Sequence, residues 1–291
     1  MQKKILRTFI HYCVIRFVQS AGELSIPVLN ALLMLSGTGL HYEKCPAQGK
    51  TLCRITERLP GSDKNSPPKI HYFHLPERAH IYLRGVSRRG RQIAASYGID
   101  RLTLNAGDII LDVGANSGDL LIYLSDLNIP LTVRCFEPDP IAFASLQLNC
   151  NNLQGALAVN KALGDKCEST MLYLSTLGGD SSLSEPATYD ATVQVNSLTL
   201  DSWLQCQTAI PPDKEIKLLK LEAEGFEPEI LEGAKEALHR IHYITADLGW
   251  ERGKSQDCTI PQVVNLLLSH NFVIEQVCRD GVHYIFRNNR C

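Results

Sequence analysis

The sequence predicts an α/β fold whose core is a mostly parallel β-sheet, covered by helices and ended by an antiparallel hairpin. From residue 105 onward, short β-rich apolar runs alternate with helical patterns, as in a parallel sheet with helices on both faces. The run Ile109–Val113 leads into a glycine-rich turn over residues 114–118. Near the end of the chain, Asp280-Gly281 separates two β-rich runs, and Asp-Gly in such a place is a hairpin signal.

The individual elements follow from apolar runs and the turn residues that bound them. Strands are expected at 109–113, 131–136, 156–163, 215–221, 243–248, 272–278 and 282–286, and helices at 120–127, 140–149, 228–239 and 260–270. Asp139 is available to cap the helix at 140–149. Two extra strands, 170–174 and 192–195, are expected around a Gly/Ser-rich loop. A mostly parallel sheet that ends in a hairpin suggests the seven-stranded, Rossmann-like sheet of class I methyltransferases.

The N-terminal part is predicted to differ from the rest. We assign residues 1–69 to a helical appendage with a connector, and residues 70–291 to the main domain. Apolar residues recur every fourth position between Ile5 and Phe17, which marks one helical face, and basic residues interrupt this stretch too often for it to span a membrane. Packing against the main domain or a second copy, as in a homodimer, is one interpretation. Peripheral membrane contact through a basic amphipathic helix is the other.

Two further segments complete this region. The apolar run 26–35 is too short to span a membrane and is expected to be a helix. Residues 41–69 contain several prolines and glycines, which favour a loop-like connector.

Composition excludes few classes of protein, but it does constrain partners. The 291 residues are 44% hydrophobic and 21% charged, with a formal net charge of −2, so bulk electrostatics do not suggest a nucleic-acid partner. Arginines cluster at 84–91, and we interpret them as a solvated helix face, with an anionic partner as the alternative. The ten cysteines form no C-x-x-C pair, which favours reduced thiols in a cytoplasmic protein and no metal site.

The turn after the first strand of the main domain carries the strongest functional signal. Gly114, Asn116 and Gly118 are spaced G-x-N-x-G, and glycine lets a ligand approach the backbone closely. A dinucleotide-binding turn wants a third glycine and faces a pyrophosphate. Asp112 instead places a carboxylate at the strand end, which repels pyrophosphate but suits a cationic amino-acid ligand. The turn therefore favours S-adenosylmethionine over a nicotinamide cofactor.

An acidic residue follows the next strand. Glu137 lies 19 positions after Gly118, about where an α/β domain binds the hydroxyls of a nucleoside ribose, and a carboxylate can accept two such hydrogen bonds. Asp165, after the expected third strand, is a candidate for contact with the adenine amino group. A plain turn aspartate is the alternative interpretation.

Carboxylates also end the two strands that follow. Lys220-x-Glu222-x-Glu224-Gly225 closes the strand at 215–221, and alternation sends the charged residues towards one side. Clustered carboxylates can raise one another's pKa, so that one acts as a base, although Lys220 opposes this. Asp247 ends the next strand at the same edge. Glu222, Glu224 and Asp247 are therefore the catalytic candidates, with a structural salt-bridge cluster as the alternative.

Taken together, these motifs resemble those of the FkbM-type methyltransferase family. The matching stretches run in order from Asp112 to Ala234: D-V-G-A-N-x-G, F-E-P, A-L-G-D, L-D, K-x-E-x-E-G and I-L-E-G-A. Glu222 departs from the family pattern, which usually has aspartate there. The resemblance implies transfer of a methyl group from S-adenosylmethionine to a hydroxyl of a glycan or small molecule, with Asp112, Gly114, Asn116, Gly118, Glu137 and Asp165 in the cofactor site. A nicotinamide-dependent oxidoreductase and a non-catalytic adaptor are the alternatives.

Overall fold

A seven-stranded sheet forms the centre of the computed structural model, which describes residues 16–21, 25–36, 38–47, 49–58, 63, 66–175, 181–206 and 210–290. The strand order is β14-β15-β11-β10-β4-β5-β6. The bounds of these strands, in that order, are Phe272–Val277, His283–Asn288, Ile241–Asp247, Ile216–Leu221, Ile109–Val113, Thr132–Phe136 and Ala156–Val159. The five neighbouring strands β11-β10-β4-β5-β6 pair in parallel, whereas β15 is antiparallel to both β11 and β14. This confirms the predicted class I methyltransferase fold.

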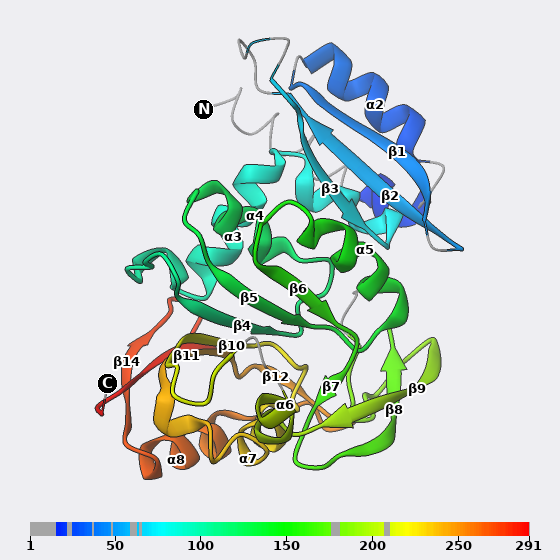
Figure 1. Ribbon diagram of the computed structural model, residues 1–291. Helices are drawn as coiled ribbons and strands as arrows, with labels where there is room; N and C mark the ends of the chain where they lie inside the picture. Colours follow the sequence, from blue (N-terminus) through cyan, green and yellow to red (C-terminus); the bar gives the residue numbers. More distant parts are fainter. Residues whose placement is uncertain are drawn as a thin grey trace.

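Helices cover both faces of this sheet, as Figure 1 shows. One apolar core lies between the sheet and the helices α6 (Leu200–Cys206), α7 (Glu227–Glu232) and α8 (Ile260–Ser269). The other core lies against α3 (Val86–Ser96), α4 (Asp119–Asp126) and α5 (Pro140–Cys150). All five side chains of β4 are buried, as expected for a central strand of a parallel sheet. This burial fixes β4 in place, and the glycine turn leaves from its carboxyl end.

Smaller elements complete the chain. A second sheet has the order β7-β9-β8 and a two-stranded ribbon joins β12 to β13. Their bounds are Ala162–Leu163 (β7), Glu168–Leu174 (β8), Ala191–Leu198 (β9), Trp250–Arg252 (β12) and Asp257–Cys258 (β13). Short 3₁₀ helices lie at η2 (Pro76–Tyr82), η3 (Ile99–Arg101) and η4 (Leu238–Arg240). The predicted cap is present, since the Asp139 carboxylate accepts hydrogen bonds from the backbone N–H groups of Ile141 and Ala142.

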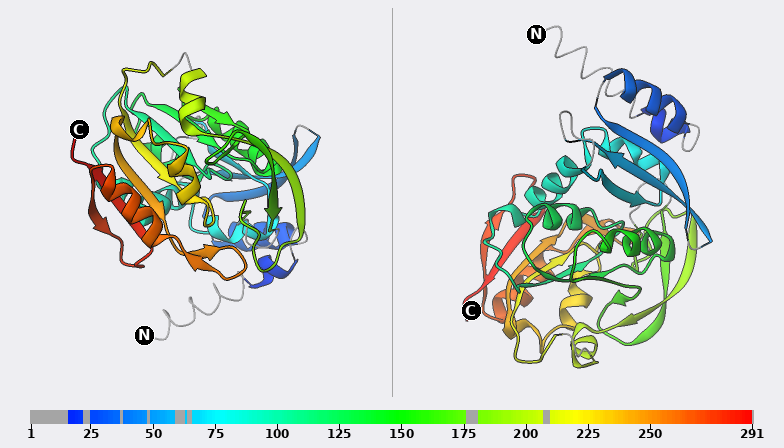
Figure 2. Two further views of the ribbon diagram at one scale, coloured as in Figure 1. Left: turned by 90° about the horizontal axis from the view of Figure 1, so that it is seen from below. Right: turned by 45° about the horizontal axis from the view of Figure 1, so that its top comes forward.

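The N-terminal region contains a sheet that the sequence analysis missed. After α2 (Ser25–Ser36), β1 (Leu40–Ala47), β2 (Lys50–Glu57) and β3 (Lys69–Phe73) form an antiparallel sheet, which stands at one end of the molecule in Figures 1 and 2. The prediction of a connector over 41–69 was therefore wrong. Pro46 misled it, but β1 is an edge strand, where proline is tolerated.

The boundary predicted at residue 70 falls inside β3, which packs against α3 and α5 of the main domain. The N-terminal sheet is thus joined to the main domain by direct contacts. The helix predicted between Ile5 and Val18 lies largely outside the described residues. Among the residues that are described, no helix has both the length and the apolarity needed to cross a membrane.

Two other predicted elements end earlier than expected. The strand predicted over 156–163 is divided in two: β6 stops at Val159 in the main sheet, and Ala162–Leu163 form β7 in the smaller sheet. Between them, the Asn160 side chain donates hydrogen bonds to the carbonyls of Glu137 and Pro138. The helix predicted over 228–239 stops at Glu232. Gly233 follows it, and a Cβ there would lie 2.0 Å from the carbonyl oxygen of Gly164.

Candidate active site

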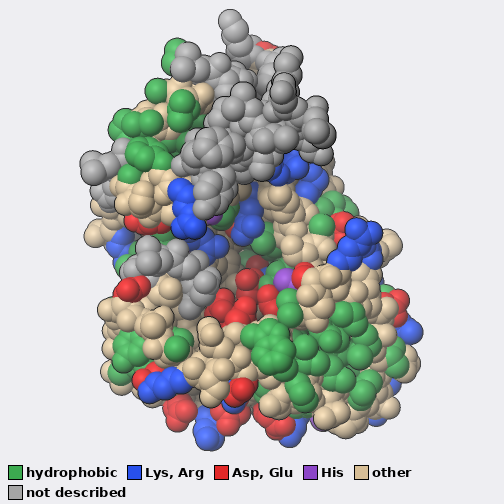
Figure 3. All heavy atoms as spheres, turned by 180° about the vertical axis from the view of Figure 1, so that it is seen from behind, with side chains coloured by type: hydrophobic (Ala, Val, Ile, Leu, Met, Phe, Trp, Pro, Cys, Tyr) green, Lys and Arg blue, Asp and Glu red, His purple; other side chains and the backbone are tan. Residues whose placement is uncertain are grey.

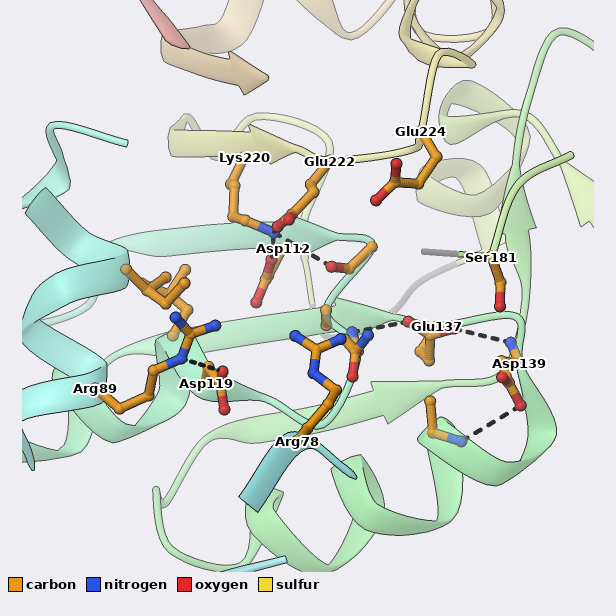
Figure 4. Close-up of a pocket in the computed structure, with 16 residues that line it drawn as sticks. Arg78, Arg89, Asp112, Asp119, Glu137, Asp139, Ser181, Lys220, Glu222 and Glu224 are labelled. Atoms are coloured by element: carbon orange, nitrogen blue, oxygen red, sulfur yellow. Dashed lines mark hydrogen bonds and ion pairs between the residues drawn. The ribbon is translucent and has the colours of Figure 1, made fainter. Parts of the chain in front are cut away.

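A pocket opens at the carboxyl ends of β4, β5 and β10, the edge at which open α/β sheets bind ligands. Figure 4 shows its side chains pointing into a common space. The described residues with charged side chains that line it are Arg78, Arg89, Asp112, Asp119, Glu137, Asp139, Lys220, Glu222 and Glu224. Figure 3 shows acidic side chains inside a hollow on the rear face of the molecule, with basic side chains above them.

The glycine turn forms one wall of this pocket. Gly114 has a φ of +69°, and its N–H and that of Ala115 donate hydrogen bonds to the carbonyl oxygen of Phe136. A Cβ on Gly114 would lie 1.7 Å from the carbonyl oxygen of Glu222. Only glycine therefore allows the turn to lie directly against the chain that leaves β10.

Glu137 connects this turn to the end of β5. Its Oε2 accepts a hydrogen bond from the backbone N–H of Asn116 at 2.7 Å, and its Oε1 accepts one from the backbone N–H of Asp139 at 2.8 Å. Burial, together with the nearby charge of Asp139, raises the pKa of Glu137 to about 8. Each carboxylate oxygen can accept a second hydrogen bond. Glu137 can therefore also bind two neighbouring hydroxyl groups of a ligand.

The floor of the pocket is an ionic cluster. Lys220 Nζ lies 2.9 Å from Asp112 Oδ1 and 3.0 Å from Glu222 Oε2. The side chains of Lys220 and Asp112 are 3% and 1% exposed, whereas that of Glu222 is 37% exposed. Burial acts to raise the pKa of Glu222, but the charge of Lys220 and its hydrogen bond outweigh this, and the pKa is lowered. Glu222 is therefore ionised at neutral pH.

The loop after β10 is held by a buried carboxylate. Glu227 Oε1 accepts hydrogen bonds from the N–H groups of Ala223 and Gly225, and its Oε2 accepts one from the Thr259 hydroxyl. Glu224, which lies between Ala223 and Gly225 in the sequence, has a φ of +49°, which is uncommon for a residue other than glycine. The clamp from Glu227 fixes this conformation, and the Glu224 side chain lines the pocket.

Two further pockets adjoin the first. One is mostly apolar, and its lining includes Phe136, Pro138, Leu163, Leu183, Phe226 and Ile230. The other is polar and is lined by Ser175, Ser182, Pro186, Ala187, Thr188, Glu222, Glu224, Glu251 and Gln256. Glu222 lines all three pockets. The three spaces therefore converge at the end of β10.

The structure places most of the predicted site residues around this point. Asp112, Gly114, Asn116 and Glu137 line the first pocket, together with Glu222 and Glu224. Gly118 instead is the N-cap residue directly before α4, at a φ of +84°. The predicted roles of these residues in binding and catalysis stay predictions.

Asp165 and Asp247 lie elsewhere and are not among the residues that line the three pockets. Asp165 follows β7 of the smaller sheet and is exposed, and its Oδ2 lies 3.6 Å from Lys166 Nζ. Asp247 Oδ2 lies 3.2 Å from His283 Nε2, and burial raises the pKa of Asp247. Their proposed roles in adenine recognition and catalysis also stay predictions.

Sequence reasoning did not identify two cations of the site. Arg78 was not singled out, and Arg89 was assigned to a solvated arginine cluster. Both precede the recognised motifs, and their sequence neighbours carry no ligand signal. A helical wheel of α3 could have separated Arg89 from Arg88 and Arg91, which are exposed. In the described part of the chain, no group of three or more His, Cys, Asp or Glu side chains is arranged to hold a metal ion.

Comparison with known proteins gives a family match and two curated relatives. The family model described as the methyltransferase FkbM domain matches residues 112–274. The 2-O-methyltransferase NoeI of Sinorhizobium fredii (strain NBRC 101917 / NGR234) is 23% identical over 217 residues, covering 69% of this chain and 88% of that protein. The 31-O-demethyl-FK506 methyltransferase FkbM of Streptomyces tacrolimicus is 25% identical over 203 residues, covering 59% and 75% respectively.

Solved structures also match. A SAM-dependent methyltransferase from Aquifex aeolicus is 14% identical, with a TM-score of 0.40, and the match covers 69% of this chain and 95% of that one.

Proposed function

The chain belongs to the FkbM family of S-adenosylmethionine-dependent methyltransferases, and from this premise we propose that it methylates a hydroxyl group of a glycan or small molecule. One observation carries the proposal: three pockets converge on Glu222 at the carboxyl end of β10. The names of both curated relatives specify methylation at oxygen, which supports a hydroxyl acceptor. The family match does not favour a nicotinamide-dependent oxidoreductase or a non-catalytic adaptor.

The residues of two pockets fit the methyl donor. The apolar slot, whose lining includes Leu163 and Phe226, suits a planar adenine, and Glu137, which lines both this slot and the charged pocket, suits the ribose hydroxyls. The amino-acid end of the methyl donor would then lie in the charged pocket, called the donor pocket below, where the Asp112 carboxylate faces its ammonium group. Opposite charges attract each other at such short range.

The affinity of this site for S-adenosylhomocysteine should depend on pH. With a pKa of about 8, Glu137 is ionised in about 1% of molecules at pH 6 and in about half at pH 8. Because ribose hydroxyls donate to the ionised carboxylate, affinity should rise roughly tenfold or more over this range, as the competent fraction grows. Isothermal titration calorimetry at several pH values measures this.

A variant isolates the contribution of Glu137 to that profile. Glu137→Gln cannot ionise, so its affinity should be weak and should show no rise between pH 6 and pH 8. A flat profile in the unmodified protein would mean that Glu137 is already ionised at pH 6. The same slope in both proteins would assign the pH dependence to another group.

The acceptor is proposed to bind in the polar pocket. Among the described residues, its lining contains Glu222, Glu224 and Glu251 together with serine, threonine and glutamine side chains, and no lysine or arginine. Hydroxyl-rich ligands can bond to such groups, whereas an anionic acceptor would face several carboxylates. We therefore infer a neutral or cationic acceptor in preference to a phosphorylated or uronic-acid one.

The protein has to bind and orient the two reactants and to accept one proton. When bound, S-adenosylmethionine supplies an electrophilic methyl group. The charged pocket and the polar pocket would hold the acceptor oxygen in line with that group, and such orientation can remove about 7–11 kcal/mol of a barrier. Glu222 is ionised through Lys220, which suits it to orient the hydroxyl. Glu224 lines both the donor and the acceptor pockets and is the proposed general base.

Glu224→Gln tests this assignment. The variant should lower the rate of methyl transfer by about 100-fold or more, because general-base catalysis contributes about 10²–10⁴-fold, while affinity for S-adenosylhomocysteine stays within twofold. The assay follows radiolabelled methyl transfer to a panel of neutral oligosaccharides, uronic-acid oligosaccharides and polyols. Glu232→Gln, at a surface ion pair in α7, is the control and should leave both quantities unchanged. Transfer at the normal rate in Glu224→Gln would exclude Glu224 as the base.

Contact of the N-terminal segment with a membrane or with a second copy of the chain is a separate proposal. In α2, the side chains of Val28, Leu32 and Met34 are exposed. This apolar surface supports a docking role for the N-terminal region.

A further inference from the structure

The N-terminal sheet and the segment that follows it brace the glycine turn from outside. His74 Nδ1 lies 3.2 Å from the Ser117 hydroxyl oxygen. The Asn149 amide donates hydrogen bonds to the carbonyls of Ser117, at 2.6 Å, and Tyr72, at 2.7 Å, and so joins the turn to β3. The loop that faces the methyl donor is therefore held partly by residues that precede the matched range 112–274.

Asp119, at the start of α4, anchors the same segment. It accepts hydrogen bonds from the Tyr82 hydroxyl at 2.7 Å and from Arg89 Nε at 2.6 Å, and it lies 3.1 Å from His71 Nε2. Burial acts to raise the pKa of Asp119, but the charge of Arg89 and these hydrogen bonds outweigh it, and the pKa falls well below its usual value. Asp119 is thus a fixed anion between β3, η2 and α3.

Arg78 projects from η2 into the donor pocket. Ala79 and Tyr82, its neighbours on this 3₁₀ helix, are buried, and the carbonyl of Ala79 accepts a hydrogen bond from the Tyr42 hydroxyl. With that side of η2 packed against the N-terminal sheet, Arg78 lines the pocket. In Figure 4 it reaches the middle of the pocket, between Asp119 and Glu137.

The donor carries an anion at the end that enters this pocket. Besides its ammonium group and sulfonium, S-adenosylmethionine has an α-carboxylate. With adenine in the apolar slot and ribose at Glu137, that carboxylate enters a space lined by Asp112, Asp119 and Glu222. Like charges repel strongly there, so the carboxylate must meet a cation.

The position of Arg78 makes it the cation best placed to do so. Lys220 lies at the floor, between Asp112 and Glu222, and Arg89 lies against Asp119 at one side. Arg78 approaches from the opposite wall, towards the middle of the pocket. Its planar guanidinium matches the two oxygens of a carboxylate.

We propose that Arg78 binds the α-carboxylate of S-adenosylmethionine, so that the N-terminal sheet and η2 complete the donor site. This inference rests on the proposed donor pocket. It assigns to the segment before β4 a direct contact with the ligand, beyond its packing against the main domain.

The experiment compares two ligands that differ only in this group: S-adenosylhomocysteine and its decarboxylated analogue, which keeps the amine. Calorimetry on the full chain should show that the unmodified protein prefers S-adenosylhomocysteine by about 10-fold to 100-fold, as expected for a charge-assisted contact. Arg78→Ala should weaken binding of S-adenosylhomocysteine by a similar factor. The affinities of Arg78→Ala for the two ligands should differ by no more than about twofold.

Arg84→Ala is the matched control, because Arg84 is exposed, follows η2 and does not line the donor pocket. It should keep the full preference. If thermal unfolding shows that Arg78→Ala is not folded, Arg78→Gln, which keeps most of the side chain's length, replaces it. The same loss of preference for S-adenosylhomocysteine is expected.

The outcomes separate this inference from the proposed function. A preference that survives in the folded Arg78 variant, or equal weakening for both ligands, would overturn the role of Arg78 and leave the donor pocket standing. Failure of the unmodified protein to bind either ligand would instead overturn the donor pocket itself.

Discussion

Replacing Lys220 with methionine is expected to destabilise the folded protein by about 3–5 kcal/mol. Asp112 and Lys220 are both almost fully buried, and their 2.9 Å contact is what neutralises the aspartate. Methionine preserves most of the volume but leaves a buried carboxylate without its counter-charge, and breaking a buried pair in this way typically costs that amount. Urea unfolding followed by circular dichroism measures the free energy.

Two matched variants test this reason. Lys217→Met changes a lysine on the same strand that lies over the Tyr243 ring, 5.3 Å from its centre, and should cost under about 1 kcal/mol. The double variant Asp112→Asn, Lys220→Met removes both charges of this pair and should recover a large part of the stability, because neither partner then leaves the other as an uncompensated buried charge. Equal losses in Lys217→Met and Lys220→Met, or no recovery in the double variant, would show that the buried charge is not the cause.

Gly114→Ala should damage both the fold and the donor site. Its Cβ would lie 1.7 Å from the carbonyl oxygen of Glu222, so the glycine turn and the loop after β10 would have to separate. Adding the strain of a non-glycine residue at a φ of +69°, about 1–2 kcal/mol, to a similar or larger cost of overpacking gives about 2–5 kcal/mol of lost stability. Affinity for S-adenosylhomocysteine should fall by about tenfold or more, as measured by calorimetry on the folded fraction.

Gly107→Ala separates the clash from the strain. Gly107 has a φ of +89°, but a Cβ there meets no atom within 4 Å, and the residue lies at the other end of β4. This variant should lose only about 1–2 kcal/mol of stability and should bind S-adenosylhomocysteine normally. If the two variants bind the ligand equally well, the contact between the turn and Glu222 does not shape the donor pocket.

The sequence predicted the site best where the chemistry follows directly from a strand end. Gly114 and Glu137 come immediately after parallel strands, and such strand ends necessarily meet at one edge of the sheet. Asp165 shows the limit of this logic. Its motif was read correctly as a turn, but it follows β7 of the smaller sheet, since the chain leaves the main sheet after Val159, where the Asn160 side chain bonds to carbonyls of the preceding loop. No periodicity in the sequence reports a side-chain contact of that kind.

The N-terminal region shows a different limit. Pro46 and Gly49 gave the composition of a loop. Pro46 nevertheless lies in the edge strand β1, where a missing N–H does no harm, and Gly49 lies in the turn between β1 and β2. Tertiary pairing with β2 and β3 overrode the local signal. The same packing brings Arg78 and Arg89 to the pocket, although both lie in segments that carry no recognisable ligand motif.

By itself, the sequence determined the alternation of strands and helices, the glycine turn and the acidic residue after β5. Each of these follows from the period of the hydrophobic residues, from the residues of a turn, or from a spacing of fewer than about 20 residues. Only the tertiary structure decided that Lys220 is buried between Asp112 and Glu222, that Asp247 faces His283, and that η2 carries Arg78 into the pocket. The reason is physical: these contacts join separate elements, and their distances depend on how the elements pack against one another.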